Sequence, residues 1–344
     1  MELDAYAASV RLEDTAAMAR RVEELGFSGL WFTETQRPPF LACAVASTVT
    51  TSIDLGTAIA VAFPRSPMIT AQNAWELARA SNGRFALGLG SQVKAHMERR
   101  FSVPFEHPGP KLREYVLALR AIWRAFQGEE RLRFEGEYYS FSLLTDFFSP
   151  GPSDHPDIPV AVAGVNAGMA RLAGEVCDGF HAHPFHSPRY LREVIRPALA
   201  AGAAAAGRAV ERCELYCPVF MIVGDSEAER VAQRESVRRQ LSFYGSTRTY
   251  RGVFELHGWG DASEQLHRLM AGGDTDAMAG IITDEMLDEY AVTATWDELA
   301  STLLGRYQGL ADRIFTYEPA QAWIDTPELA ERWQAVAAAV RRAR

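Results

Sequence analysis

The chain has 344 residues, of which 48% are hydrophobic and 23% are charged, so it can bury a large core and is not a disordered chain. Its formal net charge of −9 argues against nonspecific binding to nucleic acid or to acidic membranes. It begins without a basic segment followed by an apolar stretch, and no apolar run reaches the roughly 18 residues of a membrane helix. We therefore expect a cytoplasmic protein with no membrane or nucleic-acid partner.

Short apolar segments alternate with amphipathic ones along the chain. The strand-like segments are 3–6, 29–33, 53–60, 84–89, 158–163, 179–183, 214–223 and 312–317. Segments that are apolar throughout, such as 219–223, are typical of strands covered on both faces. Helical spacing of apolar residues predicts helices over 12–25, 68–80, 111–126, 169–176, 188–206, 296–307 and 327–344.

Eight strands that alternate with helices predict an α/β protein with a closed parallel (β/α)8 barrel, the TIM barrel. An open, doubly wound sheet is the alternative, because the sequence does not show closure. We expect a single domain over residues 1–344 with two insertions, at about 127–157 and about 243–290. The first holds two short β-like runs around Gly136, which suggest a hairpin. Insertions in such barrels usually lie on the catalytic face.

The four cysteines match no zinc or redox motif, and we expect buried free thiols in a reducing compartment. They are Cys43, Cys177, Cys213 and Cys217.

In a parallel barrel, function resides where the strands end. Glu34 ends an apolar strand, where a buried carboxylate needs either a chemical role or an arginine partner. The glycines around Gly90 allow a ligand to approach the backbone closely. Gly164 leads into a helix whose free N–H groups can hold an anion. His96, in the loop after the fourth strand, is a candidate proton donor.

Two histidines, His181 and His183, lie two residues apart on a strand and therefore point to one face. Such a pair can bind a metal or donate to a phosphate, although packing in the core explains it equally well. In barrel hydrolases of the metal-dependent kind, the paired histidines usually come from the first strand, whereas these come from the sixth.

Several motifs together resemble the luciferase-like family of flavin and deazaflavin oxidoreductases. The strongest is SNGRFALGLGS at 81–91, which resembles the turn and L-G-L-G strand of that family. Others are GFSGLW at 26–31 with Glu34, LGTA at 55–58 with PRSP at 64–67, and AGEVCDG at 173–179. The segment KAHMERR at 94–100 resembles the subgroup that uses the deazaflavin coenzyme F420. The resemblance covers nearly the whole barrel.

The resemblance implies a coenzyme ring in the barrel mouth. The positions that match the family's coenzyme contacts are Ala58 and Ile59 at a non-prolyl cis peptide, Ala60, Gly90, Gln92, His96, Ala163, Gly164, Val165, His183 and Pro184. Those at 163–165 and 183–184 match the segments that hold the ribityl-phosphate tail. Glu34 matches an acidic position near ring and substrate. The family's sugar-phosphate dehydrogenases carry His and Trp where this chain has 36–38, which argues against a sugar-phosphate substrate.

The resulting hypothesis is hydride transfer between C5 of F420 and an organic substrate, with His96 and then Glu34 as candidates for the proton role. Resemblance also implies a homodimer, the commonest oligomer. Three alternatives stay open: an FMN-dependent monooxygenase, a metal-dependent hydrolase using His181 and His183, and a noncatalytic coenzyme-binding protein. We expect the aromatic residues of the second insertion either to line a substrate pocket or to pack the interior of the insertion. They are Tyr244, Tyr250, Phe254, Trp259 and Tyr290.

Overall fold

A ring of eight parallel strands forms the centre of the protein in a computed structural model that describes residues 1–343. The hydrogen-bonded order runs β10-β12-β1-β2-β3-β5-β8-β9, and β9 pairs with β10, which closes the barrel. The strands are β1 (Glu2–Ala8), β2 (Gly29–Thr33), β3 (Asp54–Thr57), β5 (Phe85–Gly90), β8 (Val160–Gly164), β9 (Gly179–Ala182), β10 (Glu214–Val223) and β12 (Arg313–Thr316). The prediction of a closed barrel is confirmed, and the open sheet is excluded.

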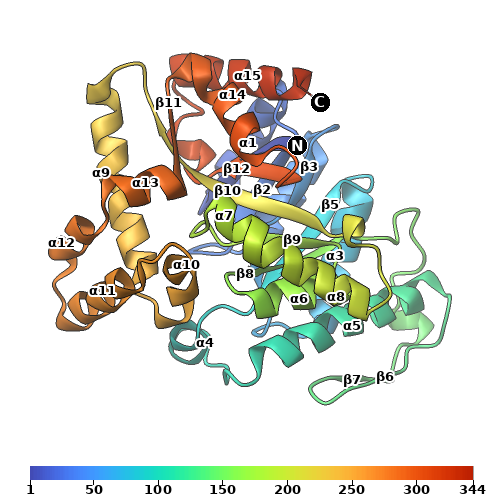
Figure 1. Cartoon of the computed structure of the whole chain (residues 1–344). Helices are drawn as coiled ribbons and strands as arrows, with labels where there is room; N and C mark the ends of the chain where they lie inside the picture. The colour runs from blue at the N-terminus through green and yellow to red at the C-terminus, as the bar shows by residue number, and fades with distance from the viewer. Residues whose placement is uncertain (344) are drawn as a thin grey trace.

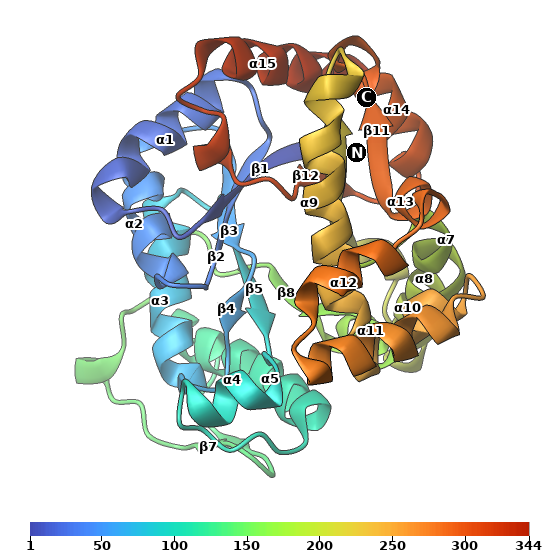
Figure 2. The same cartoon turned by 90° about the vertical axis from the view of Figure 1, so that its left-hand side faces the viewer.

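Helices surround this ring, as Figure 2 shows in a view roughly along the barrel. Most of them follow a strand and return the chain antiparallel to it, as a parallel sheet requires. They are α1 (Leu12–Glu24), α2 (Pro39–Val49), α3 (Pro67–Ala80), α5 (Pro108–Gln127), α6 (Ala167–Val176), α7 (Pro188–Tyr190), α8 (Arg196–Ala205), α14 (Trp296–Tyr307) and α15 (Pro327–Arg342). Figure 1 shows α15 next to α14, with the two chain ends on the same side of the molecule.

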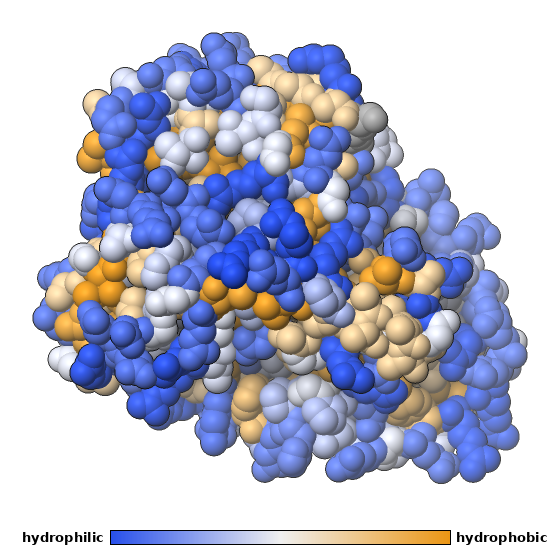
Figure 3. All heavy atoms as spheres, viewed as in Figure 1, coloured by the Kyte–Doolittle hydropathy of each residue, from blue (hydrophilic) through white to orange (hydrophobic). Residues whose placement is uncertain are grey.

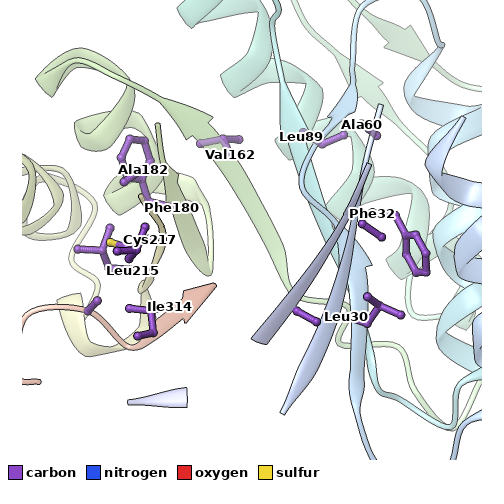
Figure 4. Close-up of a cluster of buried hydrophobic side chains, with 14 of the residues drawn as sticks. Leu30, Phe32, Ala60, Leu89, Val162, Phe180, Ala182, Leu215, Cys217 and Ile314 are labelled. Carbon is purple, nitrogen blue, oxygen red and sulfur yellow. The ribbon is translucent and has the colours of Figure 1, made fainter. Parts of the chain in front are cut away.

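Apolar side chains fill the layer between strands and helices. Leu30, Phe180, Leu215 and Ile314 are fully buried there, and Figure 4 shows such residues on opposite sides of the ring. All four cysteines are free and buried, as expected. The face in Figure 3 is mostly hydrophilic, with apolar residues in small separate patches. No helix in residues 1–343 is long and apolar enough to pass through a bilayer.

A buried ion-pair network closes the amino-terminal end of the barrel. Arg313 on β12 binds both carboxylate oxygens of Asp4 on β1, at 2.7 and 2.9 Å, and reaches Asp54 on β3 at 2.8 Å. The Asp4 side chain is wholly buried and also accepts the Trp31 indole N–H at 2.8 Å. Burial raises the pKa of Asp54, an effect that Arg313 opposes. The network ties together three strands distant in sequence.

The predicted third strand is not continuous. It stops at Thr57 and resumes as β4 (Ala60–Val61), which pairs with β5, and the peptide between Ala58 and Ile59 is cis, as the resemblance implied. The predicted helix over 188–206 is interrupted by a π-helical stretch, η2 (Leu191–Ile195). Pro197 follows it and lacks the N–H that a regular helix would use, which explains the irregular turn.

Both predicted insertions contain structure. The first holds the antiparallel hairpin of β6 (Phe134–Glu135) and β7 (Ser140–Phe141), as expected, followed by the short turn η1 (Asp146–Phe148). The second holds η4 (Arg248–Tyr250), α10 (Arg251–Glu255), α11 (Gly260–Gly272), α12 (Thr275–Met278), η5 (Ala279–Ile281) and α13 (Asp284–Tyr290).

Three α-helices and one strand escaped the prediction: α2, α4 (Lys94–Arg99), α9 (Glu227–Gly245) and β11 (Ala291–Ala294). Helix α9 is polar along most of its length and buries only a few positions, such as Val237 and Leu241, so its apolar stripe is weak. Helix α2 is apolar on nearly all sides, which hides its periodicity. Strand β11 pairs only with the carboxyl-terminal half of β10, outside the ring.

Candidate functional site

The strand ends with the predicted site residues are neighbours along one edge of the barrel. Val61 pairs with Gly90, Leu89 pairs with Val162, and Gly164 pairs with Ala182. The carboxyl ends of β4, β5, β8 and β9 therefore form one continuous edge. The fold brings together there the backbones of Ala60, Gly90, Ala163 and Gly164, with His183 directly after β9.

The segment after β3 packs directly on the end of β5. A Cβ atom on Gly90 would lie 2.6 Å from Ile59 Cδ1, so only glycine allows the Ile59 side chain to rest there. Ala58 and Ile59 are partly exposed, whereas Ala60 is buried. An aliphatic surface is therefore available at this point of the mouth, suited to the face of a flat ring.

Gly164 and His183 make a corner at the ends of β8 and β9. The His183 N–H donates to the Gly164 carbonyl at 3.0 Å. Helix α6 begins three residues after Gly164, and a Cβ placed on Gly168 in its first turn would meet nothing within 4 Å. The helix start is thus open to an anion, which its free N–H groups favour. Val165 and Pro184 are buried beside this corner.

His183 is a neutral hydrogen-bond donor. Its Nδ1 accepts from the Phe185 N–H at 3.1 Å, so the proton lies on Nε2. Burial, with a smaller contribution from His186, lowers the pKa of His183 to about 3. No acceptor for Nε2 occurs in residues 1–343, which leaves this donor for a ligand.

Glu34 is held by an arginine that the sequence left unnamed. Arg65 donates to both carboxylate oxygens at 2.6 and 2.8 Å, and the Val61 N–H donates to one of them at 2.7 Å. The Glu34 side chain is only 7% exposed. Its carboxylate therefore fixes the turn after β4 to β2. The signal for Arg65 was present in the PRSP motif that follows the third strand.

Gln92 and His96, both predicted at the coenzyme edge, differ in their exposure to solvent. Gln92 is half-buried, has a φ of 61°, and its side-chain oxygen accepts the Val93 N–H at 2.9 Å. His96 lies on α4, which is anchored by the buried Met97, and its own side chain is exposed. The structure thus places Gln92 at the strand end and His96 on the surface of the following helix.

Several tyrosines lie near His183, and the sequence analysis named only Tyr244 and Tyr250 among them. Tyr244 and Tyr250 contact the His183 ring, with centroids 4.6 and 5.0 Å away. The Tyr244 hydroxyl bonds to that of Tyr317, which stacks on Tyr6. Burial raises the pKa of Tyr6 to about 12, so it stays a neutral phenol. Tyr6 and Tyr317 were missed because each sits within an ordinary apolar strand pattern.

The other aromatic residues that the sequence pointed to in the second insertion pack its interior. Phe254, Trp259 and Tyr290 contact one another, with Phe185 stacked on Tyr290 at 5.2 Å. They form core, and Tyr244 and Tyr250 are the members of the predicted wall that reach the site.

His181 and His183, the pair of the hydrolase hypothesis, lie in different surroundings. His181 is buried among Trp31, Tyr216 and Phe315, where burial lowers its pKa to about 3, and neither ring nitrogen has a partner in the described chain. Across residues 1–343, His, Cys, Asp and Glu nowhere gather in threes in a way that could hold a metal. This arrangement gives the pair no third ligand.

Comparison with known proteins identifies one family and several relatives. Residues 2–313 match the sequence profile of the family described as luciferase-like monooxygenase. An uncharacterised protein of Mycobacterium tuberculosis is 45% identical over 304 residues, 88% of this chain and 89% of that protein. An F420-dependent glucose-6-phosphate dehydrogenase of Beutenbergia cavernae is 30% identical over 224 residues, 59% of this chain and 62% of that enzyme.

The fold is similar to that of a solved enzyme. The structure of the coenzyme F420-dependent tetrahydromethanopterin reductase from Methanopyrus kandleri superposes with a TM-score of 0.78 at 18% identity, covering 100% of this chain and 99% of that one. At this identity the likeness establishes the barrel architecture.

Proposed function

Because the chain belongs to the luciferase-like monooxygenase family, a family of enzymes, we propose that it is an oxidoreductase that uses coenzyme F420. When bound, this deazaflavin accepts or supplies a hydride at C5, here exchanged with an organic substrate. The F420-dependent relative from Beutenbergia cavernae supports this coenzyme. FMN is the second candidate, because the family's description names monooxygenases.

The observation that carries the proposal is the corner of Gly164 and His183. A neutral His183 Nε2–H without an acceptor in residues 1–343 stands next to an open helix start, and both groups suit the phosphate that joins ring and tail. Ala163, Val165 and Pro184 complete this corner. The residues therefore fit a phosphate-bearing coenzyme.

The remaining residues would orient the ring and the substrate. Ala58, Ile59 and Ala60 would support the ring face, with Gly90 and Gln92 at its edge. His96 is the better candidate for the proton role, because an imidazole on an exposed helix can exchange protons with solvent. Glu34 is already bound by Arg65 on both oxygens, so we assign it to positioning.

A titration of the purified protein with F420 and with FMN tests the proposal. We expect F420 to bind at micromolar or lower concentration, with a change in ring fluorescence, and FMN to bind at least about tenfold more weakly. A matched His183→Leu variant should weaken F420 binding while its thermal unfolding stays cooperative. Binding of FMN alone would overturn the F420 assignment in favour of the monooxygenase.

We also propose a cytoplasmic homodimer acting on a small-molecule substrate. Exposed apolar side chains support an interface between two copies of the chain. They include Leu41, Ile69, Leu143, Phe147 and Phe148. Light scattering would then give twice the 38.0 kDa mass of one chain.

A further inference from the structure

A positively charged cavity lies in the second insertion, away from the strand ends. Its volume is about 410 Å³, and Arg248, Arg251, Ser263, Glu264, His267 and Arg268 line it. Three arginines thus stand against two carboxylates, Glu264 in the lining and Glu255 beside Arg251, in a chain whose net charge is −9. Figure 2 shows the helices that carry it, α10 and α11, side by side below α9. Such a local excess of positive charge attracts anions.

Two of the arginines are free to bind a ligand. Glu264 already binds Arg251 at 2.5 Å, and Arg251 also binds Glu255 at 2.6 Å. Arg248 and Arg268 are exposed, and neither forms an ion pair within residues 1–343. Guanidinium groups bind carboxylates in a two-pronged geometry, so each can hold one carboxylate of a ligand.

The segment between Arg248 and Arg251, which both line the cavity, contacts the corner of Gly164 and His183. Asn166, in the loop after Gly164, donates to the Thr249 carbonyl at 2.8 Å, and the Tyr250 ring lies 5.0 Å from that of His183. Thr249 and Tyr250 connect Arg248 to Arg251 in the chain. A ligand whose phosphate sits at the corner would therefore meet the cavity with whatever extends beyond that phosphate.

We propose that this cavity binds the carboxylate tail of the deazaflavin, the γ-glutamyl chain attached beyond its phosphate. This inference rests on the proposed F420 function. FMN ends at its phosphate and has nothing to place in the cavity. Arg248 and Arg268 would therefore favour F420 over FMN and long tails over short ones.

The test is a fluorescence binding titration with two deazaflavins, one carrying a long glutamyl tail and one ending at the lactyl phosphate. The variant is the double charge reversal Arg248→Glu and Arg268→Glu. The control is Arg192→Glu and Arg239→Glu, which makes the same charge change at two exposed arginines outside the cavity. All proteins are checked for cooperative thermal unfolding.

The unmodified protein should bind the long-tailed coenzyme more tightly. The cavity variant should lose about tenfold of that affinity at low salt and less than about twofold for the tailless coenzyme, and added salt should shrink the difference. The control should change neither value by more than about twofold. Equal weakening of both coenzymes, or none, would overturn the tail assignment. Failure of the unmodified protein to bind either deazaflavin would instead overturn the proposed function.

Discussion

At the scale of single residues, environment decides what a side chain at the barrel mouth can do. Glu34 was predicted to act in chemistry or to pair with an arginine, and the structure shows the pair with Arg65. The sequence could place Gly90, Gly164 and His183 at strand ends because motif spacing follows the strands. It could not pair Arg65 with Glu34 or Tyr317 with Tyr244, because the partners are distant from each other in the chain.

The Glu34 pair leads to a prediction on stability. Glu34→Gln leaves Arg65 partly buried without a counter-charge, and we expect a loss of about 2–3 kcal/mol in the free energy of unfolding. Urea denaturation measures it. The matched control is Glu98→Gln, whose exposed pair with Lys94 should contribute less than about 0.5 kcal/mol. Equal effects of the two substitutions would show that the buried pair is not structural.

At the scale of elements, the prediction succeeded where burial on both faces left apolar runs, as in β10, whose bounds were predicted in full. It failed where an element makes only partial contact, as in α9 and β11. The broken third strand could not be seen either, because the residues from Asp54 to Val61 remain strand-like in composition while the backbone turns at Ala58. The local pattern of apolar residues indicates which residues are buried, whereas the position of a strand break depends on pairing with the neighbouring strand.

The Arg313 network joins β12, β1 and β3 and supports a second prediction. In Arg313→Met the fully buried Asp4 carboxylate loses its partner, and we expect stability to fall by about 3–5 kcal/mol. Chemical denaturation measures this change. Adding Asp4→Leu to the same chain should recover a large part of the loss, because it removes the unpaired charge. A single substitution that costs under about 1 kcal/mol would contradict the assigned role in closing the barrel.

At the scale of the whole molecule, the predicted closed barrel is confirmed. It could be predicted because eight strand segments alternate regularly with helices in the sequence. The barrel interior could not be predicted. Three histidines on β9 or directly after it lie in buried surroundings, and burial lowers the pKa of His181 and His183 to about 3 and of His186 to about 4. The sequence singled out His181 and His183 as a pair on one face, but it could not show how deeply each ring is buried.

These histidines predict how stability depends on pH. The unfolded chain takes up their protons below about pH 6.5, whereas the folded chain does so only near pH 3–4, so stability falls as the pH drops through this window. Between pH 6.5 and 5 we expect a loss of about 1 kcal/mol or more for each histidine, measured by urea unfolding. His181→Leu should make the decline shallower. Constant stability from pH 7 to 5 would show that these histidines are not buried as neutral groups.

The second insertion supplies Tyr244 and Tyr250 to the mouth, and its aromatic residues Phe254 and Tyr290 pack on Phe185, just after β9. Because Ile59, Gly90 and Gly164 belong to other parts of the chain, exchanges at Tyr244 and Tyr250 can reshape the mouth without altering those three residues. Descendants of one ancestral barrel could in this way diverge toward new substrates while inheriting the same redox chemistry.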